Sequence, residues 1–272
     1  MRILIACDME GITGVTRWEH CEPDHAEYTR FRKLMTADVN AVIEGALDAG
    51  ADEIFVADGH HSGQNLLIEE LDERAVYNAG TSSPWSMMNG IDGQIDAVLF
   101  VGYHAKAGSA GAILAHTWSN DVFDLRINGQ SHGEFGLNTL IAGYFSVPAI
   151  FVSGDQMIAQ EATAFVPGIE TAVVKQANGY FSGSCLPPEQ TQRLLTESAR
   201  TAVRNFSQSS APKPVKSTGP VDIAVEFTHP HMAETAARMP GAERRSGRSV
   251  GITCQDLPQA FLAFRTLCNL GK

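Results

Sequence analysis

Short apolar runs alternate with longer amphipathic stretches along most of this chain. Aliphatic runs bounded by polar or turn-forming residues predict buried strands, which we expect at 2–7, 53–58, 96–103, 148–154 and 171–177. From Ala26 to Ala49, apolar residues recur at helical spacing, and Gly50 follows as a helix stop. The pattern therefore predicts strands that alternate with helices over the first part of the chain.

The alternation of predicted strands and helices continues through the second half of the chain. One segment, whose composition is typical of an exposed connection, interrupts it. Further helices are expected at 84–90, 134–145 and 155–165, and Asn128-Gly129 predicts a hairpin turn after a strand at 122–127. Residues 207–220, SQSSAPKPVKSTGP, have the composition of a linker. After it, the pattern predicts strand, helix, strand and helix at 221–227, 232–239, 249–254 and 257–270.

Near-continuous apolar strands that alternate with helices indicate an α/β fold with a mixed, mainly parallel sheet covered by helices. We expect a larger α/β domain at 1–206, the linker at 207–220 and a smaller C-terminal α/β portion at 221–272. That portion can also pack into the same domain as the rest.

Composition narrows the class of protein without identifying it. The chain has 272 residues and a formal net charge of −11, which argues against a nucleic-acid binder because such proteins need a basic face. Its five cysteines are scattered and form no C-x-x-C pair, which favours a reducing compartment. We find neither a signal-peptide core nor an apolar stretch of membrane-spanning length, and expect a cytoplasmic protein with no membrane partner.

Three consecutive predicted strands are followed by side chains that can bind a metal ion. Asp8 and Glu10 follow the first strand, His60 follows the second and His104 follows the third, and Glu134 lies at a predicted helix start. Because ligands bind at the carboxyl ends of strands in such sheets, these residues are expected to lie together. Each alone also fits a structural role, as a cap, a solvated charge or a hydrogen-bonded core histidine. Their joint position favours a metal or acid–base site.

Carboxylates and imidazoles together suit zinc, manganese or non-haem iron. Three carboxylates and two histidines are more ligands than one zinc ion normally takes. Two ions that share a bridging carboxylate account for this number, and such a pair activates a water molecule and polarises a carbonyl group. The ligand types therefore predict a dinuclear metal site.

Five short motifs carry a family likeness: DMEGITG, DGHHSGQN, GYHAKAG, AHTW and HGEFGLN follow one another in order. Together they resemble the zinc D-aminopeptidase family of metallopeptidases, found with bacterial dipeptide-permease genes, over almost the whole chain. The resemblance implies two Zn²⁺ ions per subunit, with Mn²⁺ or another divalent metal as an alternative. It assigns the metal ligands to Asp8, Glu10, His60, His104 and Glu134, and a catalytic role to His116. It also implies ring-shaped homo-oligomers, pentamers that can pair into decamers.

The expected function is an aminopeptidase that hydrolyses the N-terminal bond of short peptides, with D-amino acids preferred. Asp8 would bridge the metals, and His116 would act as general acid/base, oxyanion stabiliser or nucleophile. A related amidase acting on cell-wall peptide fragments is an alternative that the sequence does not separate from an aminopeptidase. A dinuclear phosphoesterase would want more cations near the site, where the motifs offer only Lys106. In a non-enzymatic alternative, the same residues are caps and surface charges.

Overall fold

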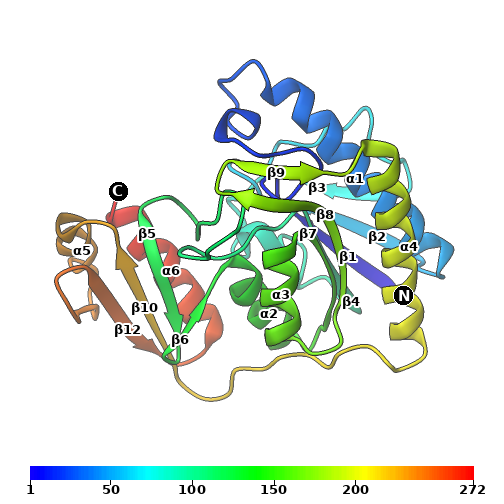
Figure 1. The fold of residues 1–272 in the computed structure, drawn as a ribbon. Helices are drawn as coiled ribbons and strands as arrows, with labels where there is room; N and C mark the ends of the chain where they lie inside the picture. Colours follow the sequence, from blue (N-terminus) through cyan, green and yellow to red (C-terminus); the bar gives the residue numbers. More distant parts are fainter.

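The larger of two sheets contains seven strands, and it carries the first, second and third strands that the sequence predicts (Figure 1). The computed structural model describes residues 1–272. The strands lie in the order β3 (Ala75–Asn78), β2 (Glu53–Asp58), β1 (Arg2–Cys7), β4 (Ala97–Val101), β7 (Ala149–Asp155), β8 (Glu170–Gly179), β9 (Ser182–Cys185). All neighbours are parallel except β8 and β9. The predicted mainly parallel sheet is therefore confirmed.

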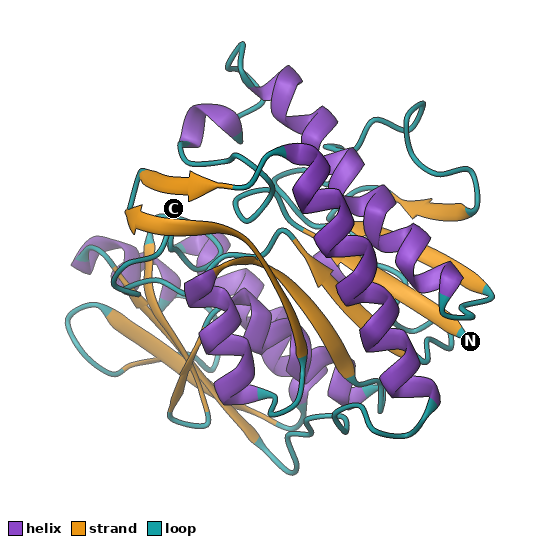
Figure 2. Ribbon diagram, turned by 45° about the vertical axis from the view of Figure 1, so that its right-hand side comes forward, coloured by secondary structure: helices purple, strands orange, loops and turns teal.

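Helices cover both faces of the larger sheet, which explains why its central strands are apolar throughout (Figures 1 and 2). Helices α1 (Tyr28–Asp48) and α4 (Pro188–Ser207) pack against each other on one face. Helices α2 (Glu134–Tyr144) and α3 (Gln156–Phe165) lie on the other face. The carboxylate of Asp155 accepts hydrogen bonds from the backbone N–H groups of Met157 and Ile158, so it caps α3.

The smaller sheet has five antiparallel strands and takes residues from both sides of the expected linker. Its order is β11 (Glu243–Arg244), β12 (Ser249–Cys254), β10 (Val221–Phe227), β5 (Val122–Ile127), β6 (Gln130–His132). Helices α5 (Pro230–Ala236) and α6 (Leu257–Leu270) pack against this sheet, and α6 also contacts α2. Helix α5 ends at Ala236, three residues before the end at 239 that the sequence pattern predicts.

One hydrophobic cluster of 39 buried residues links the two sheets. It contains Leu4 and Phe100 of the larger sheet, Leu137 of α2, Val225 of β10 and Phe264 of α6. A second cluster, of 32 residues, fills the opposite side of the larger sheet beneath α1 and α4. Helix α6 therefore lies between the smaller sheet and α2, with one face buried that includes Phe261 and Phe264. None of the helices has both the length and the apolar character needed to cross a membrane.

Candidate metal centre

The predicted ligands gather where the strand order reverses direction. Strand β1 has β2 on one side and β4 on the other, and ligands of α/β sheets bind at such a reversal, beyond the carboxyl ends of the strands. Asp8 and Glu10 follow β1, His60 follows β2, His104 follows β4, and Glu134 is the first residue of α2. The structure brings all five together.

Asp8 lies between two histidines, and each of its oxygens faces a different one. The distance from Oδ1 to Nδ1 of His60 is 3.3 Å, and from Oδ2 to Nε2 of His104 it is 3.4 Å. Glu10 Oε2 lies 3.1 Å from the same nitrogen of His60, and Glu134 Oε1 lies 3.4 Å from the same nitrogen of His104. The five residues thus form two groups that share Asp8.

Backbone carbonyl groups orient both histidines. His60 Nε2 lies 3.0 Å from the carbonyl oxygen of Cys21, and His104 Nδ1 lies 3.0 Å from that of Ala105. Because a carbonyl oxygen only accepts, these nitrogens donate, and in a neutral ring the lone pair is on the other nitrogen. In both residues that other nitrogen faces the carboxylates, as a metal ligand would.

Several polar atoms of the cluster are buried without a hydrogen-bond partner: Asp8 Oδ2, Glu10 Oε2 and His104 Nε2. Asp8, Glu10 and His104 are each only 2% exposed, so water does not compensate these atoms. Buried acceptors that face one another are unfavourable unless a cation or a proton lies between them. Carboxylate oxygens and imidazole nitrogens are ligand types that zinc takes in proteins. The residues present therefore fit a metal centre.

The electrostatics of the cluster also favour positive charge. Burial opposes ionisation of Asp8, but contacts with His104 and His60 outweigh it and hold the pKa of Asp8 well below its usual range. Burial alone would lower the pKa of both histidines. Glu10 and Asp8 instead raise the pKa of His60 well above its usual value, and Glu134 and Asp8 do the same for His104. A raised pKa means that the two histidines keep a proton beside the carboxylates. Bound metal ions would supply this positive charge instead.

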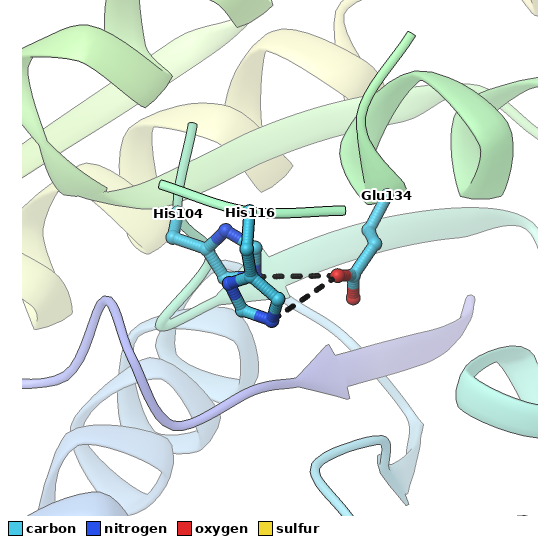
Figure 3. Close-up of side chains that lie close together, drawn as sticks. All are labelled: His104, His116 and Glu134. Atoms are coloured by element: carbon cyan, nitrogen blue, oxygen red, sulfur yellow. Dashed lines mark ion pairs between the residues drawn. The ribbon is translucent and has the colours of Figure 1, made fainter. Parts of the chain in front are cut away.

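His116 lies beside this cluster on the loop between β4 and β5. Its ring stacks on that of His104, with centroids 4.0 Å apart, and both rings face Glu134 in Figure 3. His116 Nε2 is 3.7 Å from Glu134 Oε1 and 3.9 Å from Glu10 Oε1. Burial and the nearby His104 lower the pKa of His116, so the ring is neutral at neutral pH. The ligand atoms of His104, His116 and Glu134 also lie within 4.8 Å of one another.

The backbone of this loop is strained on both sides of His116. Leu114 and Trp118 adopt φ angles of 51° and 67°, a left-handed conformation that side-chain-bearing residues rarely adopt. Several hydrogen bonds hold the loop in this conformation. Ile113 N–H donates to Asp155, His116 Nδ1 lies 2.9 Å from the Leu114 carbonyl oxygen, and Trp118 N–H donates to Glu134 over 2.7 Å. Non-glycine residues in this region cluster at functional sites.

Buried side chains that the sequence did not single out as ligands hold the ligand-bearing loops in place. The carboxylate of Asp58 accepts hydrogen bonds from the backbone N–H groups of Asn65 and Leu66, and the Asn65 side chain donates to the His60 carbonyl oxygen. Lys175 Nζ donates to three carbonyl oxygens of the Glu10 turn. The Lys175 contacts join residues at least 160 positions apart, so no local pattern reveals them, whereas Asp58 and Asn65 are close in the chain.

Two glycines allow the first and third ligand loops to touch. A Cβ atom at Gly11 would lie 2.0 Å from the Tyr103 carbonyl oxygen, and one at Gly102 would lie 2.3 Å from that of Asp8. Gly102 also has a φ of +74°, which favours glycine. The glycines in the motifs DMEG and VGYH are the signal by which the sequence could have identified this contact.

A cavity of about 490 Å³ opens over the cluster. Asp8, Glu10, His60, His116 and Glu134 form part of its wall, and Arg265, Asn269 and Lys272 from α6 and the residues that follow form another part. Trp118 lies between the two parts, since it lines the cavity and its ring packs edge-on against Phe264 of α6. Residues of the cluster and residues of the C-terminal portion therefore line the same cavity. Its volume suits a small molecule.

Three comparisons with known proteins agree. The family model described as D-aminopeptidase matches residues 1–266. A D-aminopeptidase from Bacillus subtilis (strain 168) is 34% identical over 274 residues, covering 99% of this chain and 97% of the relative. The solved structure of the Zn-dependent D-aminopeptidase DppA from Bacillus subtilis, described as a self-compartmentalizing protease, superposes with a TM-score of 0.96. It is 33% identical and covers 100% of this chain and 98% of that one.

A mainly parallel sheet with carboxylates and imidazoles at its strand ends, together with these matches, defines the chain as a metallopeptidase, a hydrolase. Within that class, the chain belongs to the D-aminopeptidase family. The family resemblance and the fold class predicted from the sequence are both confirmed.

Proposed function

We propose that this chain is a zinc-dependent D-aminopeptidase that hydrolyses the N-terminal bond of short peptides at a site for two zinc ions. The observation that carries the proposal is the position of Asp8, whose two oxygens face His60 and His104 at 3.3 and 3.4 Å. A carboxylate shared in this way suits a bridging ligand. Glu10 and His60 would complete one metal site, and His104 and Glu134 the other.

Charge arithmetic supports two ions rather than one. Two divalent cations bring four positive charges and the carboxylates of Asp8, Glu10 and Glu134 bring three negative ones, so one positive charge remains. When bound, such ions provide Lewis acidity that activates water and polarises the scissile carbonyl group. One ion would leave three buried carboxylates with a net negative charge, which is costly in a site of low exposure.

His116 is proposed to transfer the proton. Its Nε2 atom lies farther from the carboxylates, at 3.7 and 3.9 Å, than the facing nitrogens of His60 and His104, at 3.1 to 3.4 Å. Because its Nδ1 faces the Leu114 carbonyl oxygen, a neutral His116 has its lone pair on Nε2, toward the cavity. There it can accept a proton from the attacking water and return it to the departing amine.

The family matches favour the peptidase over the phosphoesterase considered from the sequence. Lys106, the cation that the motifs offered for a phosphate, donates to the Ser131 hydroxyl over 2.8 Å and lines a different cavity. A related amidase that acts on cell-wall peptide fragments would use the same metal site, and a panel of D-Ala dipeptides and muropeptide fragments separates the two activities.

The assembly is proposed to be a homo-oligomeric ring. Support comes from the DppA structure, described as a self-compartmentalizing protease, because this chain superposes on it over its full length. Pentamers that pair into decamers remain our expectation for the ring size.

Two measurements test the metal site and the proton transfer. Elemental analysis of purified protein should find about two zinc ions per chain, and chelation should abolish cleavage of D-Ala-containing dipeptides. Asp8→Ala should lose both zinc and activity. His116→Ala should keep its zinc but lose roughly 10²–10⁴-fold in kcat. One zinc per chain would contradict the dinuclear site, and full turnover by His116→Ala would contradict the role of that histidine.

A further inference from the structure

Helix α6 brings to the cavity a cation that no acidic side chain neutralises. Arg265 Nη1 donates to the carbonyl oxygens of Ser83 and Pro84, at 2.9 and 3.1 Å, and its Nη2 donates to that of Thr81 at 3.2 Å. These carbonyl groups fix the orientation of the guanidinium group but carry no formal charge. Arg245 and Arg248, in the same C-terminal portion, pair instead with Asp222 and Glu226.

The environment of Arg265 suits an anion that is supplied from outside the chain. The side chain lines the cavity above the metal cluster and is partly buried. Partial burial lowers its pKa, and no neighbouring acid acts in the opposite direction. A cation removed from water is stabilised when an anion pairs with it, and the N–H groups that the three carbonyl oxygens do not use, at Nε and Nη2, remain for a carboxylate.

The residues next to Arg265 add further hydrogen-bond donors. Asn269 lies one turn farther along α6, so both side chains are on the same helix face, and both line the cavity. Lys272 lines it as well. Acidic groups form the strand-end part of the wall and cationic or amide groups form the α6 part. The α6 part of the wall therefore offers several hydrogen-bond donors to one anion.

On the basis of the proposed function, we propose that Arg265 binds the free C-terminal carboxylate of the peptide whose N-terminal bond is cleaved at the metal centre. Asn269 supplies a second donor. Both ends of the substrate then lie within one cavity of about 490 Å³. The substrate therefore needs an unblocked C-terminal carboxylate, and peptides with a blocked C-terminus are poor substrates.

The experiment compares a D-Ala dipeptide with its C-terminal amide, using zinc-loaded wild type, Arg265→Met and Arg265→Lys. Wild type should prefer the free acid, mainly through KM. Arg265→Met should reduce that preference by at least about 10-fold, which corresponds to ~1.4 kcal/mol. Arg265→Lys, which keeps the charge, should retain part of it. Arg204→Met, which removes an exposed arginine on α4, is the matched control and should behave as wild type.

The outcomes separate this inference from the proposed function. Collapse of the acid preference in Arg265→Met, with zinc content unchanged, supports carboxylate binding. An unchanged preference overturns it while leaving the aminopeptidase intact. Equal loss on acid and amide also overturns it, since Arg265 would then only hold the loop at 81–84 in place. Wild type that cleaves neither substrate overturns the proposed function as well.

Discussion

At the scale of single residues, the turn that carries Glu10 depends on one buried lysine. Lys175 is 1% exposed, and its ammonium group donates to the carbonyl oxygens of Glu10, Ile12 and Val15 at 2.6, 2.9 and 2.7 Å. Burial lowers the pKa of Lys175 to about 8, and its three donors are fully used by the backbone. Its role is to position the turn.

We expect Lys175→Met to weaken zinc binding by roughly 10–100-fold, as loss of supporting contacts around metal ligands does. It should also lower the free energy of unfolding by about 1–3 kcal/mol, because three buried carbonyl oxygens lose their donor. Competition with a chromogenic chelator and urea unfolding measure the two effects. Lys213→Met, at an exposed lysine, is the control. Wild-type zinc affinity in Lys175→Met would show that other contacts hold the turn.

A second buried group fixes the same turn and makes stability depend on pH. The Asp38 carboxylate accepts hydrogen bonds from the backbone N–H and hydroxyl of Thr13, all near 2.9 Å. Burial raises its pKa from 3.8 to about 6. Between these values the folded chain keeps a proton that the unfolded chain releases, so this group's contribution to stability falls as pH rises through that window.

Asp38→Asn should remove this pH dependence. The free energy of unfolding of the wild type minus that of the variant should fall by about 2–3 kcal/mol from pH 4 to pH 7, at about 1.4 kcal/mol per pKa unit. Urea unfolding of both proteins across that range measures the difference, in which titration of all other groups cancels. A difference that stays constant with pH would show that Asp38 is ionised in the folded chain throughout.

Much of the candidate site could be predicted from the sequence, because each candidate ligand follows a strand or begins a helix. The ends of the predicted strands were enough to identify Asp8, Glu10, His60 and His104. The start of a predicted helix was enough to identify Glu134. Lys175 and Asp38 could not be predicted in this way, since Lys175 contacts a turn about 160 residues earlier in the chain. The orientation of His116 also depends on distant residues, Asp155 among them.

At the scale of elements, the sequence pattern identified the apolar strands and missed α4, β3 and β9. Helix α4 buries Leu195, Ala199, Ala202 and Val203, together with Thr191 and Ser198. Leu195, Ala199, Ala202 and Val203 recur at helical spacing, so the sequence carried the signal for this helix and the prediction overlooked it. Strands β3 and β9 lie at the two edges of the sheet, where no continuous apolar run is needed.

Helices α1 and α4 pack so closely at Gly45 that a substitution adding one carbon atom should disturb their contact. A Cβ atom at Gly45 of α1 would lie 2.2 Å from the Thr196 carbonyl oxygen of α4. Gly45→Ala should therefore lower the free energy of unfolding by about 1–3 kcal/mol, although alanine normally favours a helix. Denaturant unfolding measures it. Gly247→Ala, where a Cβ meets nothing within 4 Å, should change stability by less than about 0.5 kcal/mol.

At the scale of the whole molecule, two sheets are joined through a common core. Strand β5 pairs with its hairpin partner β6 on one side and with β10 on the other, and β10 follows the irregular segment at 208–220. Sequence alone could predict the strands but not this pairing, because it joins segments about 100 residues apart. The pairing places α6, and with it Arg265, at the cavity.

The mass of the protein in solution should reveal the proposed ring. Sedimentation velocity at micromolar concentration should give a mass several times that of the 29.3 kDa chain, with a single dominant species. A closed ring gives one defined size because its symmetry limits growth. A mass equal to one chain across this concentration range would contradict the ring assembly.

The order of the functional parts along the chain has a consequence for protein synthesis. All five proposed ligands and His116 lie within residues 8–134, whereas the α6 part of the cavity wall lies at residues 257–272. On the ribosome, the residues that would hold zinc therefore emerge well before those that would select a substrate. A nascent chain could acquire its metal early, but it would not yet discriminate among the peptides of the cell.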